Sequence, residues 1–430
     1  MQADDPRYAG YLKILEEELI PAAGCTEPVA VAYAAALARK ELGTVPDRVI
    51  AEVSANIIKN VKSVVVPNTG GLKGIKAAVA AGIIVGASEK KLEVISTVSE
   101  KQKEELHSYL KTASIEVRLA ETEKVFDIII KLYAGSSSAK VRIADFHTNV
   151  VLIENNGKVV FSSNMEEGSS LAGGETEDED AVSLDIKSIL DFADTVRLED
   201  VDALIERQIE LNSAISKEGL TKNYGANIGK IFREVYGDDV RIRAKAAAAA
   251  GSDARMGGSE RPVIIVSGSG NQGMTASLPV IEYAAELGKS RESLVRALVL
   301  SNLTAIHLKK GIGRLSAYCG VVCAGAAAGA GIAYLCDGGL EGISSTIVNA
   351  LATVSGIVCD GAKPSCAAKI AAAVDAGILG FEMFKNSQAF YPGDGIVSYG
   401  VEDTIRNVGR LGSEGMKTTD KEIIRMMLET

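Results

Sequence analysis

Two long stretches without a charged residue, 315–336 and 342–359, constrain most strongly what this chain of 430 residues can fold into. Uncharged runs of this length either span a membrane or lie inside a large helical protein. The first run is mostly Ala and Gly, which are weakly apolar, and neither run is flanked by aromatic belts or by a basic asymmetry. We therefore expect buried helices that pack closely through small residues, and no membrane partner.

The pattern changes between residues 92 and 163, where β-branched, alternating runs predict strands. A helix is expected between the first two runs, and Asn155-Asn156-Gly157 predicts a hairpin turn because it tolerates positive φ. Two helices are expected before residue 45, and nearly everything after residue 182 has a helical period. The expected strands lie within 92–98, 115–121, 124–134, 139–154 and 158–164.

A chain of this length is expected to form two structural units. The pattern predicts an α+β fold: a mainly helical catalytic domain formed by residues 1–90 and 182–430, with a small α+β (β-sheet) domain inserted at 91–181. The inserted unit ends in the acidic, Gly/Ser-rich linker "EEGSSLAGGETEDED".

The charge and cysteine content exclude several classes of protein. A formal net charge of −10 without a segregated basic patch disfavours a nucleic-acid partner, because backbone phosphates repel an acidic surface. The amino terminus lacks the pattern of an export signal, so we expect a cytoplasmic protein whose thiols stay reduced. Six cysteines in such a chain do not form a disulfide framework, so chemistry or burial must explain them.

The stretch "VIIVSGSGNQGMTASLP" contains Gly268-x-Gly270-x-x-Gly273 between a strand-like run and a helix, as in a dinucleotide fingerprint. Pro279 in the following helix, and the lack of a second parallel strand pattern, argue against that interpretation. A Gly-rich turn that grips a small carboxylate is the better hypothesis. An ordinary strand-to-helix turn is the structural alternative. The polar residues of the turn are Ser267, Ser269, Asn271 and Gln272.

Five of the six cysteines fall within residues 319–366. Zinc sites usually use two close pairs, and only Cys319 and Cys323 form one, so zinc is disfavoured. An iron–sulfur cluster accepts wider spacings. Cys359 and Cys366 flank a turn and can converge on one object, with Cys319 or Cys323 as a third ligand. The alternative for each thiol taken alone is a small buried residue.

The sixth cysteine, Cys25, stands in "GCTEP", where the chain is expected to enter a helix. Thr26 can cap that helix, Glu27 suits its positive end, and Pro28 fits its first turn. A helix N-terminus lowers the pKa of a thiol, which favours a reactive thiolate, although the charge of Glu27 would oppose this. The alternative is that Cys25 is a small core residue.

Four motifs follow one another along the chain: "PAAGCTEPVAVAYAAA" (21–36), "SGSGNQG" (267–273), "YCGVVCAGAAAGAG" (318–331) and "VCDGAKPSCAAK" (358–369). Together and in this order they resemble the L-cysteine desulfidase family, which is related to the α region of bacterial iron–sulfur L-serine dehydratases. The likeness covers essentially the whole chain.

The resemblance implies a lyase that converts L-cysteine to pyruvate, ammonia and hydrogen sulfide with a 4Fe-4S cluster and without pyridoxal phosphate. It implies that Cys319, Cys359 and Cys366 hold the cluster, with one iron left open for substrate, and that Cys25 is the catalytic base. Cys323 and Cys336 match no ligand position and are expected in the core.

The substrate is expected to be a small amino acid, gripped by polar groups near the open iron. Arg314 and Lys363 are further candidates for pairing its carboxylate. Three rival functions stay open: a 4Fe-4S L-serine dehydratase, a cluster-free amino-acid-binding protein, and a nucleotide-dependent dehydrogenase. A homo-oligomer is compatible with the sequence. The substrate-binding candidates are Asn60, Asn68, Thr69, Ser269 and Asn271.

Overall fold

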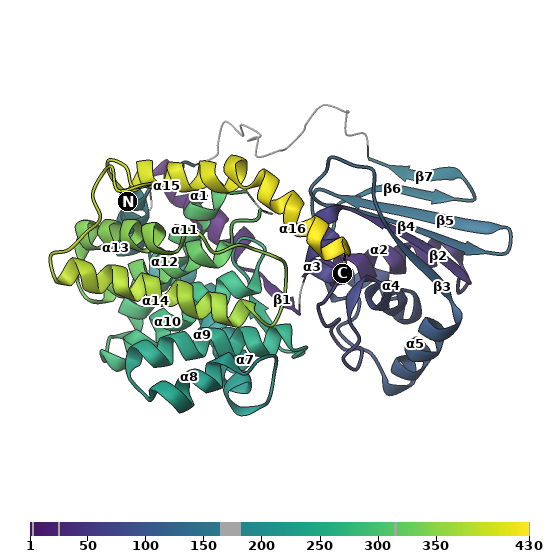
Figure 1. The fold of residues 1–430 in the computed structure, drawn as a ribbon, viewed down its shortest axis with the longest axis horizontal. Helices are drawn as coiled ribbons and strands as arrows, with labels where there is room; N and C mark the ends of the chain where they lie inside the picture. The colour runs from purple at the N-terminus through teal and green to yellow at the C-terminus, as the bar shows by residue number, and fades with distance from the viewer. Residues whose placement is uncertain (2–3, 25, 164–181, 314–315, 430) are drawn as a thin grey trace.

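The computed structural model describes residues 1, 4–24, 26–163, 182–313 and 316–429. Two bodies lie side by side, one made of helices and one built on a sheet (Figure 1). The helices of the first body are α1 (Pro6–Glu18), α6 (Ile186–Thr195), α7 (Leu198–Thr221), α8 (Ile228–Tyr236), α9 (Val240–Met256), α10 (Gly270–Glu286), α11 (Arg291–Lys310), α12 (Gly320–Leu335), α13 (Gly339–Val354), α14 (Cys366–Lys385) and α15 (Val401–Arg410).

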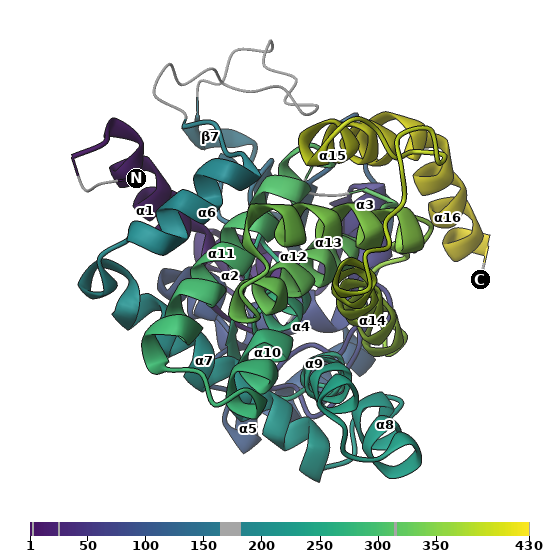
Figure 2. The same ribbon diagram turned by 90° about the vertical axis from the view of Figure 1, so that its left-hand side faces the viewer.

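Helix α12 lies in the middle of the helical body, with α10, α11, α13 and α14 around it (Figure 2). Its glycines permit this packing, since a Cβ on Gly329 would stand 2.6 Å from the carbonyl oxygen of Gly377 on α14. Close contact through small residues buries almost every side chain of α12. The first uncharged run therefore contains a buried helix, as predicted, whereas the second contains α13, only part of which is buried. Among the described residues, none of the helices is long and apolar enough to cross a membrane.

The second body holds a six-stranded sheet of order β3-β2-β4-β5-β6-β7, in which only the β2–β3 pair is parallel. Helices α2 and α4 pack together, and α2 covers β4 and β5 (Figure 1). The elements are α2 (Thr26–Leu42), β2 (Arg48–Val53), α3 (Ala55–Val61), α4 (Gly74–Val85), the 3-10 turn η1 (Ser88–Glu93), α5 (Glu100–Thr112), β3 (Ser114–Leu119), β4 (Asp127–Ala134), β5 (Ser137–Ala144), β6 (Val150–Asn155) and β7 (Lys158–Ser162).

These elements confirm the α+β fold class with a mainly helical part. The hairpin turn is confirmed too, with positive φ at Asn156 and Gly157 between β6 and β7. The strand predicted at 92–98 is wrong: this segment begins in η1 and continues as a turn. Val94 and Ile95 are each 1% exposed. A strand would point these neighbours to opposite faces, whereas both pack into the same core.

The two hydrophobic cores show how the segments on either side of residue 90 pack. Residues from α2, β2 and α4 belong to the core that also contains β4 and β5. The reason is that β2 pairs with both β3 and β4, so the segment from α2 to α4 packs with the sheet and not with the helical core. The helical core takes its residues from 1–19 and 184–408.

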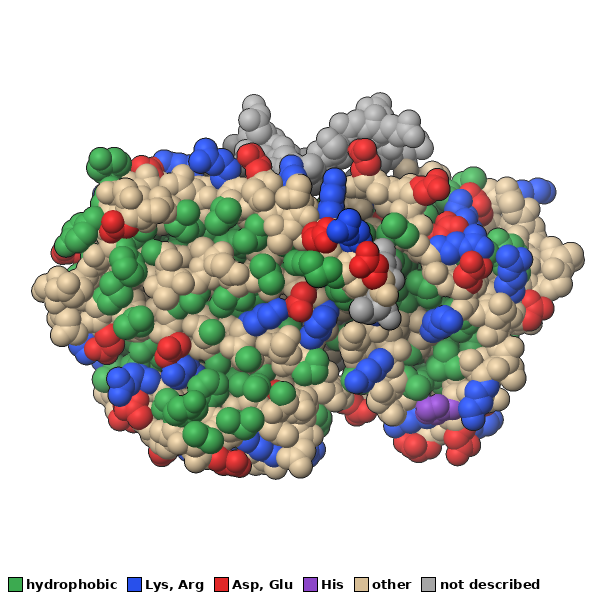
Figure 3. All heavy atoms as spheres, in the orientation of Figure 1, with side chains coloured by type: hydrophobic (Ala, Val, Ile, Leu, Met, Phe, Trp, Pro, Cys, Tyr) green, Lys and Arg blue, Asp and Glu red, His purple; other side chains and the backbone are tan. Residues whose placement is uncertain are grey.

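Within the described ranges, two elements connect the bodies. Strand β1 (Pro21–Ala23) pairs antiparallel with β8 (Pro262–Ile264) on the helical side and leads directly to α2. The π-turn η2 (Leu411–Gly415) follows α15, and the last helix α16 (Lys417–Glu429) then crosses to α3 (Figure 1). Charged side chains of both signs gather on the face where the bodies meet (Figure 3).

The dinucleotide interpretation of the Gly-rich turn is contradicted by the sheet that precedes it. Strand β8 belongs to a two-stranded antiparallel sheet with β1, and no parallel strand accompanies it among the described residues. A dinucleotide fold requires a parallel βαβ unit at this place. Helix α10 also contains Pro279 in its interior.

Candidate active site

The three predicted ligand cysteines come from two neighbouring segments of the helical body. Cys319 is the N-cap residue of α12, and Cys366 is the first residue of α14. The segments that carry Cys359 and Cys319 run antiparallel: the Cys359 N–H donates to the Ala317 carbonyl (2.6 Å) and the Cys319 N–H donates to the Ile357 carbonyl (3.1 Å). The bridged pair is Tyr318 and Val358, and Cys319 and Cys359 each follow a member of this pair.

The thiols of these cysteines interact. A hydrogen bond with the Cys319 thiol lowers the pKa of Cys359, and the same bond together with burial raises the pKa of Cys319. The Cys366 thiol donates to the Gly361 carbonyl at 3.5 Å, and burial and the charge on Cys359 raise its pKa. The arrangement favours one thiolate at Cys359 and couples all three groups electrostatically.

Two buried lysines face this cluster of thiols. Lys59 of α3 is 2% exposed and forms an ion pair with Asp420 of α16. Lys309 near the end of α11 is 5% exposed and donates to the Gly313 carbonyl. Burial lowers the pKa of Lys309, while the charges of the nearby cysteines oppose that change. Both lysines add to the lowering of the Cys359 pKa. Sequence reasoning missed them; a lysine inside an otherwise apolar helical run was the available signal.

The turn between Cys359 and Cys366 packs tightly against α3. Gly361 has a φ of +95°, and a Cβ on it would overlap the carbonyl oxygen of Lys59. Behind the turn, Cys366 and Ala362 pack against Val64 and Met256. The sheet body therefore contributes α3 and the chain that follows it to a site whose three clustered cysteines belong to the helical body.

The Gly-rich turn lies on the same side of the helical body. Positive φ at Ser267 and Gly268 makes the turn tight, and the Ser269 hydroxyl caps α10 by accepting from the Gln272 N–H at 3.4 Å. A Cβ on Gly320, the residue after Cys319, would stand 2.7 Å from the side-chain amide carbon of Gln272. The turn predicted to grip a carboxylate therefore adjoins the cysteine cluster.

Arg255, at the end of α9, joins this turn to the amino-terminal segment. It is 5% exposed, and its Nη2 donates to the Gly24 carbonyl at 2.6 Å. A Cβ on Gly270 would stand 2.5 Å from the Arg255 Nε. Sequence reasoning missed Arg255, because its neighbours come from segments remote in the sequence. Cys25 and Arg314 lie outside the described residues.

The other substrate-binding candidates divide into two groups. Asn60 is 4% exposed and lies beside Lys59 on α3, near the cysteines. The Asn68 amide donates to the Ile95 carbonyl (2.7 Å), and the Thr69 hydroxyl donates to the Val66 carbonyl (2.7 Å). These bonds stabilise the loop after α3, so the structure gives Asn68 and Thr69 local partners within the sheet body.

The remaining polar and sulfur candidates contact residues close to their own helix or turn. The Lys363 ammonium donates to the Asp360 carbonyl within its own turn. Cys323 is fully buried in α12, and Cys336 is half-buried at the end of the same helix. His307 and Glu402 are joined by a bond of 2.8 Å between α11 and α15.

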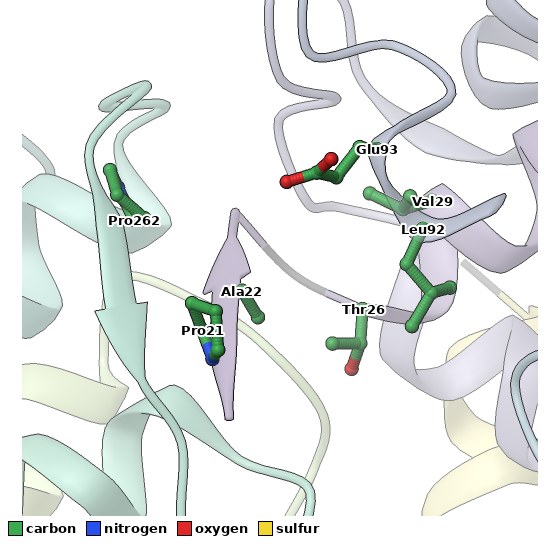
Figure 4. A pocket seen from close by; sticks show the side chains of 7 residues that line it. All are labelled: Pro21, Ala22, Thr26, Val29, Leu92, Glu93 and Pro262. Carbon is green, nitrogen blue, oxygen red and sulfur yellow. The ribbon is translucent and has the colours of Figure 1, made fainter. Parts of the chain in front are cut away.

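A small pocket opens beside the connecting strand β1 (Figure 4). It lies between β1, β8, η1 and the start of α2, and none of the cysteines that the structure describes lines it. Its one charged lining residue is Glu93, which would repel the carboxylate of an amino acid. The chemistry of the cysteine cluster therefore lies elsewhere. The lining residues are Pro21, Ala22, Thr26, Val29, Leu92, Glu93 and Pro262.

In the described ranges, no set of three or more His, Cys, Asp or Glu side chains is arranged to hold a single metal ion. An iron–sulfur cluster places a different requirement on its ligands, because the cysteines bind separate irons of one larger inorganic unit. The thiols around Cys359 are of the type that such a cluster uses.

Replacing Asp420 by Ala is expected to loosen α16 from α3. The change leaves the Lys59 ammonium buried without its carboxylate, which typically costs about 3 kcal/mol. Hydrogen–deuterium exchange should become faster in both helices. Asp403→Ala is the matched control, because its pair with Arg406 is exposed on α15. Unchanged exchange in α16 of the Asp420 variant would contradict the role of this ion pair.

Comparisons with known proteins place this chain in a family. The model of the serine dehydratase alpha chain family matches residues 89–425, a range that includes all three clustered cysteines and the Gly-rich turn. The chain is 60% identical over 428 residues to a UPF0597 protein of Desulfitobacterium hafniense, covering 100% of this chain and 98% of the relative. It is 51% identical to a UPF0597 protein of Lachnoclostridium phytofermentans, covering 98% and 100%. The chain therefore belongs to the serine dehydratase alpha chain family and is a serine dehydratase-like protein.

Proposed function

We propose that this protein is an L-cysteine desulfidase, a carbon–sulfur lyase that converts L-cysteine to pyruvate, ammonia and hydrogen sulfide. It uses a 4Fe-4S cluster held by Cys319, Cys359 and Cys366, and no pyridoxal phosphate. The observation that carries the proposal is the meeting of these three thiols beside two buried lysines.

The residues present fit such a cluster. Thiolates are its usual ligands, and the surroundings of Cys359 already favour the thiolate form. The charges of Lys59 and Lys309 offset the negative charge that three thiolates would bring into a buried place. Three protein ligands also leave one iron of a four-iron cluster without a cysteine.

When bound, the cluster supplies a Lewis acid at that iron, which can stabilise charge on the departing sulfide. The chain itself must remove the α-proton of the substrate, and we assign this role to Cys25. It directly precedes α2, whose first N–H groups favour a thiolate. Its neighbour Gly24 is held by the hydrogen bond from Arg255, which links that segment to the Gly-rich turn.

We assign the carboxylate of the substrate to the Gly-rich turn, with Ser269 and Asn271 at the start of α10, and we keep Asn60 as a further polar contact. Asn68 and Thr69 have loop-stabilising bonds, so we assign them a supporting role. The reaction suits the cytoplasm, where the thiols stay reduced.

L-Serine dehydratase is the second candidate function, and the match to the serine dehydratase alpha chain family favours it. Both reactions remove an α-proton and a β-substituent, so the same residues serve either substrate. They differ in the leaving group, which is sulfide in one case and water in the other.

Anaerobic purification with iron and acid-labile sulfide assays tests the proposal, followed by product assays with L-cysteine and L-serine. About four irons per chain, with sulfide and pyruvate from L-cysteine, is the expected result. Pyruvate from L-serine alone would establish the dehydratase instead. Absence of iron after reconstitution, with no turnover of either amino acid, would overturn both and leave an amino-acid-binding protein.

A further inference from the structure

Helix α8 carries an apolar face that the rest of the chain covers only in part. Residues 228, 231, 232 and 235 follow the spacing of one helix face. Ile228 and Phe232 pack against alanines of α9 and α14. Ile231 and Val235, in contrast, are 44% and 67% exposed. Figure 3 shows hydrophobic side chains gathered over α8, on the lower part of the helical body. Part of this face is therefore turned to solvent.

The covered side of α8 is held firmly against α9. Gly229 is buried, and a Cβ on it would stand 2.7 Å from the carbonyl oxygen of Ala246. The Gly229 N–H donates to the carboxylate of the buried residue Asp253 at 3.0 Å. A helix of nine residues is not stable in water by itself, so these contacts fix its position. The open side of α8 is therefore a preformed surface.

The open side consists of two neighbouring rows, each made of two residues four positions apart. Ile231 and Val235 form the apolar row. Lys230 and Glu234 form the charged row beside it, since residues four apart lie one above the other on a helix. Glu234 is exposed, and the Lys230 ammonium has two N–H groups besides the one that it donates to Asn223 at 2.8 Å. We refer to these two rows as the α8 face.

A second copy of this chain complements the α8 face. When two such helices lie antiparallel about a two-fold axis, each row meets the same row in the reverse direction. Lys230 then faces Glu234 of the second copy, and Ile231 faces Val235 of the second copy. Opposite charges meet in one row, and apolar side chains leave water in the other. A parallel arrangement would bring Lys230 against Lys230, so the charge pattern selects the antiparallel one.

We propose that the α8 face is the centre of a homodimer interface with two-fold symmetry. Tyr236, which is 63% exposed at the end of α8, extends the apolar surface. The contact between two nine-residue helices is small, so we expect a dissociation constant in the micromolar range. The inference does not depend on the reaction that the cysteine cluster performs.

Sedimentation equilibrium of the full chain, purified anaerobically, tests this at concentrations from about 1 to about 100 μM. The wild type should change from monomer to dimer across this range. Lys230→Glu should raise the dissociation constant by about 10-fold or more, because each Glu234 then faces a second carboxylate. Lys230→Glu combined with Glu234→Lys should restore the wild-type value, since both copies then carry the reversed row. Ile231→Glu should leave only monomer, because it places a charge in the apolar row.

Val159→Glu is the matched control, because Val159 is a 59% exposed valine on β7 of the sheet body. This variant should dimerise as the wild type does. A monomeric wild type would overturn the inference and leave the α8 face to a different protein. The inference also fails if the double charge reversal stays as weak as Lys230→Glu in a protein with wild-type circular dichroism. Loss of the dimer in Val159→Glu, with an intact dimer in Ile231→Glu, would move the interface to the sheet body.

Discussion

Cys359→Ser is expected to abolish iron binding and to lower the rate of sulfide release by more than about 100-fold. Mutating a residue that only hydrogen-bonds to a metal ligand costs up to about 100-fold in activity, and loss of the ligand itself should cost more. Cys359 is the thiol whose pKa the site lowers, through the bond from Cys319, the charges of Lys59 and Lys309 and the Gly361 N–H. A serine hydroxyl stays protonated in the same surroundings, so the preferred anionic ligand is lost. Iron content, acid-labile sulfide and sulfide release, all measured anaerobically, check this result.

Cys336→Ser provides the matched control for this change. Cys336 lies at the far end of α12 from Cys319 and is only half-buried, so the hydroxyl can meet water. The variant should keep the iron content and activity of the wild type. A Cys359→Ser protein with full iron would contradict the assignment of this residue as a ligand, and the ligand set would then have to be sought elsewhere.

Much of the fold could be predicted because it depends on local patterns. The β-branched runs that became β3 to β7 and the small-residue helices α12 to α14 each carry their period over many residues. The strand prediction for residues 92–98 was wrong, because tertiary packing buries the neighbours Val94 and Ile95 in the same core and overrides the alternating pattern. The pairing of β2 could not be predicted, because its partners β3 and β4 come next to it only in the assembled sheet.

The residues of the candidate site likewise fall into those that local sequence patterns reveal and those that only long-range contacts reveal. The cysteine motifs and the Gly-rich turn are visible as short sequence patterns, and the structure brings Cys319, Cys359 and Cys366 together. Lys59 could not be identified, because its partner Asp420 is 361 positions away in the chain. Arg255 likewise acts through Gly24, 231 positions away. Charged groups that are buried only by long-range contacts leave no periodic signal in the sequence.

Gly361→Ala is expected to detach the turn that carries Cys359 and Cys366 from α3. The left-handed φ of +95° alone costs a residue with a side chain roughly 1–2 kcal/mol. The new methyl group would also overlap the Lys59 carbonyl oxygen, which belongs to the helix backbone and cannot rotate away. The turn must therefore move, and the distance between the two thiols changes with it. We expect a lower midpoint of thermal unfolding and faster loss of iron to a chelator.

Gly356→Ala separates this local effect from a general sensitivity to added methyl groups. Gly356 precedes the same turn, has no atom within 4 Å of the position of a Cβ, and does not require a positive φ. Alanine there should leave iron retention unchanged and stabilise the fold by up to about 1 kcal/mol, because it restricts the unfolded chain. If both variants lost iron equally, the contact between Gly361 and Lys59 would not be what holds the turn. If only Gly361→Ala loses iron, the sheet body maintains the geometry of ligands that all belong to the helical body, which explains why the site lies where the two bodies meet.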